Sequence, residues 1–350
     1  PIKSSAASDV YKRQVIGSDL VVYSAAIAKD NVELNAAASY GIPTVERSVL
    51  LGYVSRLYKQ SICVSGTHGK TTTTSMITTA LELAGRDPSA VIGGRLPLIN
   101  GYGKAGKGDD IVIEACEFAE TFLKLTPYLS VVLNIDNDHL DYYGSMGELK
   151  FAFKRFALMT QFMIFANADD KNTMDVMYTL DRRVRTFAID NHADYRAINV
   201  NEYKPGFFEF DLKEWSKVTG HIRLAVPGRH NIYNALAMCA VCRFAGLTVE
   251  QCAAAAAMAL GNLLGLVCDP VAGLVEVPCI KRNVVGAVNA VSCANMALAG
   301  VDYAIPCDEV IDAMGRVGSL LSPDLRETGQ GGLAATPTGV RIAERLAEEA

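Results

Sequence analysis

The chain has 350 residues, half of them hydrophobic, so it can bury a sizeable core and is long enough for two or three domains. The formal net charge is −5 and no long basic run stands out, which argues against a nucleic-acid or membrane-surface partner. Nine cysteines follow no secreted spacing and no signal peptide precedes them, so we expect a reducing, cytoplasmic compartment.

The first fourteen residues, PIKSSAASDVYKRQ, show neither helical nor strand periodicity. They resemble translated sequencing-adapter sequence, so we expect residues 1–14 to be an artefactual or disordered leader outside the fold. From Asp19, the run DLVVYSAAI predicts a buried strand, and NVELNAAASYGIPTV predicts a helix, a glycine stop and a short strand.

The next segment, SICVSGTHGKTTTTSMITTALELAG, predicts a strand, a loop and a helix that ends at Gly85. Two further apolar runs, DIVIEA and SVVLNI, predict buried strands, and GELKFAFKRFALM predicts a helix in the same region. Strands that alternate with helices indicate an α/β fold, in which a parallel sheet is covered on both faces.

The segment from Val184 to Leu224 predicts short antiparallel strands, with FFEFDL the clearest, and HNIYNALAMCAVCRFAG then predicts a helix. From about Ala245 the chain becomes rich in alanine and glycine, with helical runs and few strand signals, so we expect a domain boundary there. The most apolar window, Cys252 to Cys268, is broken by Gly261 and Asn262, which favours a packed helix over a membrane span.

A glycine-rich turn lies between the strand SICV and the helix that follows it, in the sequence SGTHGKTTTT. Backbone N–H groups from Gly66 to Thr71 would face phosphates, Lys70 would neutralise their charge, and the Thr71 hydroxyl would hold Mg²⁺. The usual phosphate-loop spacing asks for a glycine where this chain has Val64, so the motif by itself does not establish a phosphate site. Its place between a strand and a helix supports one.

Polar groups follow three of the predicted strands, after Val64, Ile113 and Leu133. Ligands bind at the carboxyl ends of strands in an open parallel sheet, so we expect these groups to converge. Glu114 would supply an oxygen ligand for Mg²⁺, and His139 would bind a second metal or a phosphoryl oxygen. Taken singly, Glu114 is more often a solvated strand-end residue and His139 a surface or capping histidine.

Cys239 and Cys242 form a CxxC spacing that invites a redox interpretation. At this spacing both thiols lie on one face of an apolar helix, so core packing is the favoured interpretation.

Five segments, in this order and spacing, resemble the Mur ligases: GTHGKTTTTSMI, VIGG, IEACEFAETFLKLTP, VLNIDNDHLDYYGS and VPGRHNIYNALA. The resemblance runs from about Val15 to Leu247 and is strongest to members that join L-alanine to UDP-N-acetylmuramate. It implies a partial UDP-binding, Rossmann-like domain at 15–59 and a central P-loop, ATP-binding domain at 60–247. It also implies an ATP-dependent amide ligase of peptidoglycan precursor synthesis, which works through an acyl phosphate.

The resemblance assigns roles to individual residues. It implies that Lys70, Glu114 and His139 are catalytic, and that Thr71 joins Glu114 and His139 in holding Mg²⁺. It implies that Asn234 contacts the adenine. The residues implied to bind ATP are Gly66, Thr67, His68, Gly69, Lys70, Thr71, Thr72, Arg229, His230 and Asn234.

The segment after Leu247 resembles instead the C-terminal part of the iron–sulfur L-serine dehydratase α chain, through CDPVAGLVEVPCIKRN and LRETGQGGLAATPTG. In that family the two cysteines of the first motif ligate a [4Fe–4S] cluster, and they would be Cys268 and Cys279 here. The third protein ligand belongs to a part of that family not seen in this chain. The resemblance therefore implies an incomplete remnant site, in a mainly helical segment at 248–350.

Two families joined inside one helical stretch predict a chimera rather than a natural fusion, which would keep whole domains and a linker. We expect the ligase part to be inactive, because the family's third domain does not follow Leu247. The alternatives are an iron–sulfur serine dehydratase fragment and a nucleotide-binding fragment without catalysis.

Overall fold

The structure is a computed structural model that describes residues 15–24, 27–258 and 275–277, the last three by their backbone alone. The chain divides into two compact units, one of residues 1–57 with 266–350 and one of residues 58–265. The leader 1–14, most of the helical segment expected at 248–350, and both Cys268 and Cys279 lie outside the described residues.

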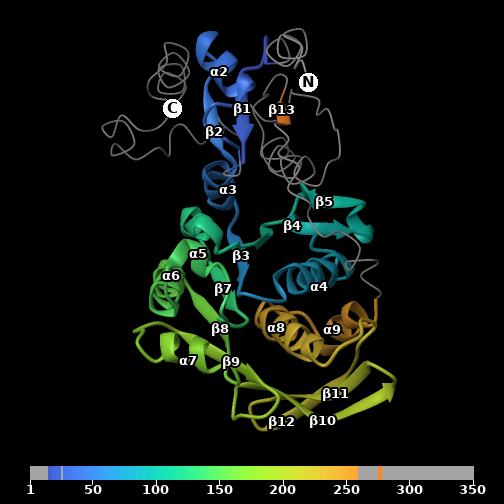
Figure 1. The fold of residues 1–350 in the computed structure, drawn as a ribbon. Helices are drawn as coiled ribbons and strands as arrows, with labels where there is room; N and C mark the ends of the chain where they lie inside the picture. The colour runs from blue at the N-terminus through green and yellow to red at the C-terminus, as the bar shows by residue number, and fades with distance from the viewer. Residues whose placement is uncertain (1–14, 25–26, 259–274, 278–350) are drawn as a thin grey trace. The chain divides into compact units, whose positions relative to one another are not determined.

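The first unit contains a three-stranded sheet in the order β13-β1-β2 (Figure 1). Strand β1 (Leu20–Tyr23) pairs in parallel with β2 (Thr44–Glu46) and antiparallel with β13 (Val275–Val277). Between β1 and β2, helix α2 (Val32–Ser39) begins at Asn31, whose amide oxygen accepts hydrogen bonds from two backbone N–H groups. Helix α3 (Arg47–Ser55) follows β2. The predicted strand, helix and strand are confirmed.

The second unit is an α/β structure. Its strands are β3 (Gln60–Ser65), β4 (Ser89–Leu96), β5 (Gly101–Lys104), β6 (Asp110–Glu114), β7 (Leu129–Val132), β8 (Met163–Asn167), β9 (Val184–Ala188), β10 (Tyr195–Lys204), β11 (Phe207–Glu214) and β12 (Lys217–Arg223). Its helices are α4 (Lys70–Leu83), α5 (Leu140–Tyr143), α6 (Met146–Met159), α7 (Lys171–Met177), α8 (His230–Phe244) and α9 (Val249–Ala256). Short 3₁₀ segments lie at η1 (Pro97–Ile99) and η2 (Phe118–Lys124).

The strands form one ten-stranded sheet in the order β12-β11-β10-β9-β8-β7-β3-β6-β4-β5. Every neighbouring pair from β10 to β4 in this order is parallel. The pairs at the two ends of the sheet are antiparallel. Because β7, β3 and β6 are direct neighbours, the three polar strand ends predicted to converge do lie side by side.

Helices cover both faces of this sheet, with α4 and α8 on one side and α6 and α7 on the other (Figure 1). In β3, Ile62 and Val64 belong to the core cluster that includes Met76 and Ile77 of α4. Cys63 alternates with them and is fully buried as well. A strand buried on both faces reads as a continuous apolar run, which explains why SICV predicted it. The predicted fold class is confirmed.

Some strand predictions were wrong or missing. β9 lies in the segment expected to be antiparallel, but it pairs in parallel with both β8 and β10. Strand direction depends on the connection, and here α7 carries the chain back between β8 and β9. Strands β4, β5 and β8 were not predicted. β4 contains Gly93 and Gly94, which interrupt the apolar pattern of a strand.

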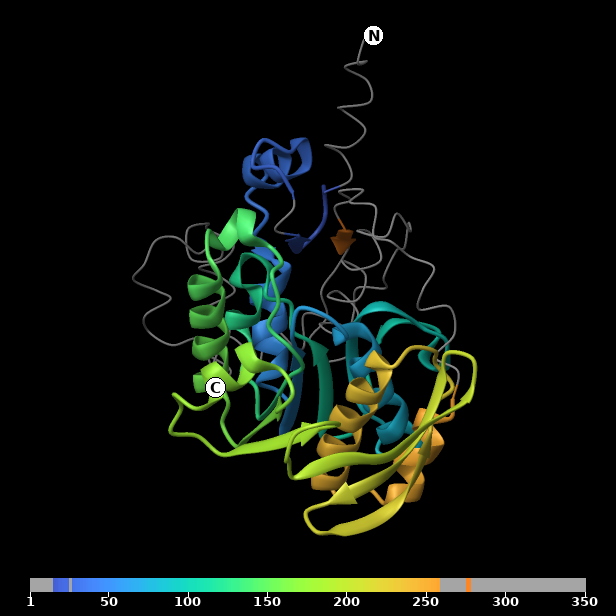
Figure 2. The same ribbon diagram turned by 60° about the horizontal axis from the view of Figure 1, so that its bottom comes forward.

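Helix α9 packs against α4 and β12, so the second unit continues past the change of composition near Ala245 (Figure 2). It begins with a capping box, in which Thr248 and Gln251 each accept a backbone N–H of the other. Cys239 and Cys242 are free and fully buried in α8, so the core-packing interpretation of the CxxC spacing is confirmed. No helix among the described residues has the length and apolar character that crossing a bilayer requires.

Candidate functional site

The loop between β3 and α4 makes two turns that favour glycine. Gly66 has a φ of +141° and Gly69 a φ of +88°. A Cβ at Gly66 would lie 2.9 Å from the Cβ of Leu133, and a Cβ at Gly69 would collide with Oδ1 of Asn234. The loop backbone therefore packs closely against its neighbours, and the first turn of α4 presents N–H groups that have no acceptor within the helix. Such a helix end suits a phosphate.

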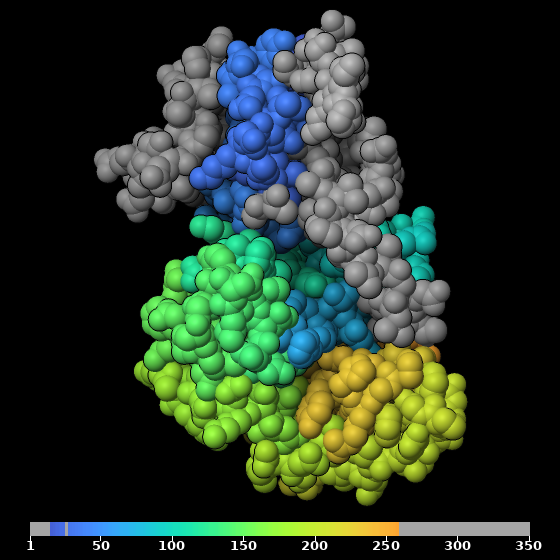
Figure 3. Space-filling view, viewed as in Figure 1, coloured from blue at the N-terminus to red at the C-terminus, as the bar shows by residue number. Residues whose placement is uncertain are grey.

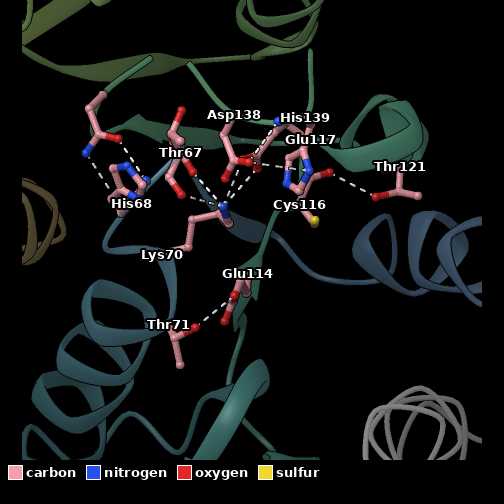
Figure 4. A network of polar contacts seen from close by, with 12 residues as sticks. Thr67, His68, Lys70, Thr71, Glu114, Cys116, Glu117, Thr121, Asp138 and His139 are labelled. Atoms are coloured by element: carbon pink, nitrogen blue, oxygen red, sulfur yellow. Dashed lines mark hydrogen bonds and ion pairs between the residues drawn. The ribbon is translucent and has the colours of Figure 1, made fainter. Parts of the chain in front are cut away.

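Lys70 is the first residue of α4, and its side chain turns back over the loop (Figure 4). Its Nζ donates to the carbonyl oxygens of Gly66 at 2.7 Å and Thr67 at 3.1 Å. It also lies 3.0 and 2.9 Å from the two carboxylate oxygens of Glu117. The side chain of Glu117 is 1% exposed and that of Lys70 is 14% exposed, so they form a buried ion pair.

Thr71 and Glu114 form a second pair of polar groups beside Lys70 (Figure 4). The Thr71 hydroxyl donates to Oε1 of Glu114 at 2.9 Å, and Oε2 accepts the backbone N–H of Gly93 at 2.6 Å. Hydroxyl and carboxylate oxygens are the ligands that Mg²⁺ prefers. The donor set at this place therefore fits the predicted metal.

His139 lies apart from Glu114, on the other side of Lys70 (Figure 4). Its ring packs on that of Phe118 with centroids 5.0 Å apart, and its Nδ1 is 3.7 Å from a carboxylate oxygen of Asp138. Among the described residues, no group of three His, Cys, Asp or Glu side chains is placed to hold a metal. The metal-ligand role of His139 therefore stays a prediction.

The first half of the loop is tied to the segment that follows β7. The Thr67 hydroxyl accepts the backbone N–H of Asp136 at 2.9 Å. The side chain of Asn134 makes two hydrogen bonds to the backbone of His68. Its amide oxygen accepts the His68 N–H at 2.8 Å, and its amide nitrogen donates to the His68 carbonyl at 3.0 Å. The imidazole of His68 stays 68% exposed. The backbone of His68 is therefore fixed as part of the loop, whereas its imidazole is directed to solvent.

Asn234 supports the loop from α8. Its amide oxygen accepts the Thr73 hydroxyl at 3.2 Å, and its amide nitrogen donates to Oδ1 of Asn231 at 2.7 Å. Asn234 is only 4% exposed and sits under Gly69. Both ends of the amide have protein partners in this structure, and its predicted contact with adenine stays a prediction.

Arg229 and His230 lie at the exposed start of α8. The Arg229 guanidinium is 3.6 Å from a carboxylate oxygen of Asp190. Asp169 fixes the segment that carries Asp190, because its carboxylate accepts three successive backbone N–H groups, at 189–191, and the Tyr233 hydroxyl. Burial and the charge of Asp169 together raise the pKa of Tyr233, so this hydroxyl remains a donor at neutral pH.

The structure thus gathers most of the predicted residues at one edge of the sheet. On the face seen in Figure 3, the surface of α4 lies between that of α5 and α6, in green, and that of α8 and α9, in orange. The predicted loop residues here are Gly66, Thr67, His68, Gly69, Lys70, Thr71 and the half-buried Thr72. Glu114 joins them from β6, and Asn234 from α8.

Two residues with contacts here had no predicted role. Glu117 follows Glu114 by three positions at the same strand end, and its carboxylate was the available partner for the loop lysine. Asn231 precedes Asn234 by one helical turn, which places both amides on one face of α8. A search for polar side chains three positions from a predicted site residue could have found both residues.

Two family models match the chain. The Mur ligase middle domain matches residues 64–242, and the serine dehydratase alpha chain matches residues 233–334. The two matches overlap at 233–242, inside α8. The resemblances to both families are therefore confirmed, and they meet in one helix.

Curated relatives match the first of these regions. The UDP-N-acetylmuramate–L-alanine ligase of Caldanaerobacter subterraneus subsp. tengcongensis is 43% identical over 239 residues, which cover 68% of this chain and 52% of the relative. The enzyme of the same name from Acetivibrio thermocellus is 44% identical over 238 residues, covering 67% and 50%. This chain therefore spans about half the length of the curated relatives it matches.

A solved structure shows the same similarity. The crystal structure of the UDP-N-acetylmuramate-alanine ligase of Thermotoga maritima superposes with a TM-score of 0.59 at 27% identity. The superposition covers 68% of this chain and 54% of that one.

Proposed function

The chain belongs to the Mur ligase family, and from this premise we propose that its unit 58–265 binds MgATP and transfers the γ-phosphoryl group to a carboxylate. The observation that carries the proposal is that Lys70, held over the loop, and the Thr71–Glu114 pair lie at the same edge of the sheet (Figure 4). Phosphoryl transfer depends mainly on positioning and on neutralising charge, and these groups supply both.

Each group has a distinct task in this proposal. The N–H groups of the first turn of α4 bind phosphate oxygens, and Lys70 neutralises charge at the β- and γ-phosphates. Thr71 and Glu114 would hold Mg²⁺, with His139 as a further candidate ligand from the segment after β7. The bound metal would neutralise charge on the phosphate oxygens. Arg229, His230 and Asn234 are proposed to lie toward the nucleoside.

We infer further that the carboxylate is that of UDP-N-acetylmuramate and that the amine is L-alanine. This inference is supported by the names of the two relatives that are 43% and 44% identical. In the first step a carboxylate oxygen attacks the γ-phosphorus and ADP leaves, which forms an acyl phosphate. In the second step of the ligation the amine of L-alanine attacks the acyl carbon and inorganic phosphate leaves. We propose that this chain does not complete the second step, because residues 233–334 match the serine dehydratase alpha chain.

Calorimetric titration of the full chain with MgATP tests the nucleotide site. Lys70→Ala should abolish MgATP binding. The double variant Lys70→Ala with Glu117→Gln should abolish it as well, and in this variant no unpaired carboxylate is left in the site. Lys59→Ala is the matched control, because Lys59 is 76% exposed and pairs with Asp109 at the other end of β3. Equal ATP affinity for the wild type and both Lys70 variants would remove this loop as the site.

Positional isotope exchange tests the first chemical step. ATP labelled with ¹⁸O in the β,γ-bridge should scramble its label only when UDP-N-acetylmuramate is present, because ADP must form reversibly. UDP-N-acetylglucosamine lacks the lactyl carboxylate and is the matched control. ATP binding without any exchange would favour the alternative, a nucleotide-binding fragment without catalysis.

The match to the serine dehydratase alpha chain supports a second, smaller proposal about residues 233–334. We infer that Cys268 and Cys279 correspond to cluster ligands of that family, and that two thiolates alone leave a [4Fe–4S] cluster open to loss. Anaerobic reconstitution with iron and sulfide should therefore give no iron that survives gel filtration. Iron that is retained by the wild type, and lost in Cys268→Ala, would favour the dehydratase alternative.

A further inference from the structure

The ammonium of Lys70 is saturated by protein acceptors. An ammonium has three N–H donors, and those of Lys70 reach the carbonyls of Gly66 and Thr67 and the carboxylate of Glu117. A phosphate oxygen that binds Lys70 must therefore replace at least one of these acceptors. The carboxylate is the acceptor whose charge opposes that of a phosphate.

Glu117 is held firmly in this position. Its backbone carbonyl accepts the Tyr143 hydroxyl and the Glu120 N–H. Among the described residues, its Oε2 has no hydrogen-bond donor and is within ion-pair distance of Lys70 alone. The side chain is nearly inaccessible to water, so Lys70 is the group that balances its charge.

The charge of Glu117 lies next to the place that a phosphate would take. Its two carboxylate oxygens are 3.0 and 2.9 Å from the Nζ of Lys70, so a phosphate oxygen that binds this ammonium must come close to them. Like charges at such a short separation repel each other.

We propose that Glu117 is a positioning residue that competes with the phosphates of a nucleoside triphosphate for Lys70. It holds the ammonium over the loop before the nucleotide binds, and its fixed negative charge weakens nucleotide binding. When the nucleotide binds, a phosphate oxygen takes the ammonium over from the carboxylate. The inference rests on the proposed nucleotide site and adds to it an internal competitor.

The size of the effect follows from electrostatics. At the effective dielectric constant of a partly buried site, two like charges within 10 Å repel enough to change an affinity by about tenfold. The repulsion grows with the number of phosphate charges near Lys70. It should therefore be largest for ATP, smaller for ADP and absent for adenosine.

Titration of the full-length protein with these three ligands, with Mg²⁺ present, tests the proposal. Glu117→Gln keeps an oxygen that Lys70 can donate to and removes the charge, so the Kd for ATP should fall about tenfold. The Kd for ADP should fall less, and that for adenosine should not change. A merely structural role of Glu117 would not produce this dependence on phosphate charge.

Glu120→Gln is the matched control, because Glu120 lies in the same loop and pairs with Arg155 at 2.9 and 3.1 Å. It makes the same change in net charge without touching Lys70, and its ATP affinity should stay within about twofold of the wild type. Circular dichroism confirms that each variant is folded.

Glu117→Asp keeps the charge but withdraws it from Nζ by one methylene, so it covers the case in which Glu117→Gln does not fold. Its ATP affinity should lie between those of the wild type and Glu117→Gln. Unchanged or weaker ATP binding in the folded Glu117 variants would overturn the competition. Failure of the wild type to bind ATP would instead refute the proposed nucleotide site, so the two failures are distinguishable.

Discussion

Ion pairs in the unit 58–265 occur in two contrasting settings. In the loop after β3, the Lys70–Glu117 pair is almost fully buried. On the ribbon of β10, β11 and β12, Arg223 pairs with Glu209 at 3.0 Å, and His221 pairs with Asp211 at 2.8 Å. The basic side chains of these two pairs are 58% and 54% exposed.

The difference lies in what each pair costs when it is broken. The ribbon pairs stand directly opposite each other in the β11–β12 register. Their carboxylates, on Glu209 and Asp211, are 19% and 30% exposed, so both keep contact with water when a pair is broken. The loop pair has a carboxylate that water cannot reach, so the lysine is needed as soon as the carboxylate is buried. An ion pair therefore contributes little to stability on the ribbon, whereas in the loop it balances a buried carboxylate and positions the lysine.

The largest expected effect is on the buried pair. Lys70→Ala leaves the Glu117 carboxylate buried without its partner and should lower the free energy of unfolding by about 3 kcal/mol. Lys70→Ala combined with Glu117→Gln should recover most of that loss, because no unpaired charge remains. Urea unfolding of the four proteins of this double-mutant cycle measures the coupling. Additive losses would contradict the contrast between the loop and the ribbon.

A smaller effect is expected at the backbone of the loop. Gly69→Ala should lower the free energy of unfolding by about 2 kcal/mol, because of its positive φ and its collision with Asn234. Gly144→Ala is the matched control: its φ is +73°, and no atom lies within 4 Å of the added Cβ. The control should cost about 1 kcal/mol from backbone strain alone. Equal losses in urea unfolding would show that close packing under Gly69 is unimportant.

Asp169 offers an intermediate case with a pH signature. Burial raises its pKa, but hydrogen bonds from the backbone at 189–191 and from Tyr233 outweigh burial and hold the pKa below its ordinary value. Its contribution to stability is therefore present above the unfolded pKa, about 3.9, and is lost as the pH falls through the folded value. Asp169→Asn should cost about 1.5 kcal/mol at pH 7. The variant should also show a flatter loss of stability in acid, and an unchanged acid profile would refute this role.

The smallest effect is expected on the ribbon. Arg223→Ala should shift the Tm by about 1 °C or less, because Arg223 is 58% exposed and exposed ion pairs contribute little to stability. The Asp211 carboxylate raises the pKa of His221, so any stabilisation is complete below the unfolded pKa and is lost as the pH rises through the folded value. Thermal melts of the wild type and of His221→Gln, compared at pH 6 and pH 8, measure this. A loss of stability as large as that expected for Lys70→Ala would contradict the contrast between the ribbon and the loop.

The sequence by itself determined the local features of this protein. The run SICV, the glycines at 66 and 69 and the Lys-Thr start of α4 predicted the strand, turn and helix that the structure contains. The CxxC spacing on an apolar helix predicted two buried thiols. Such features are encoded within a few neighbouring residues, because periodicity and turn conformation depend on local backbone geometry.

Only the tertiary structure decided which distant groups meet. Lys70 and Glu117 are 47 positions apart, and they form a pair because β3 and β6 are neighbours in the sheet. The parallel direction of β9 follows from the path of α7, which the pattern of β9 does not encode. Asn234 reaches Thr73 across 161 positions because α8 packs on α4. Strand order and helix packing are set by burial over the whole unit, so no local window of sequence could reveal these contacts.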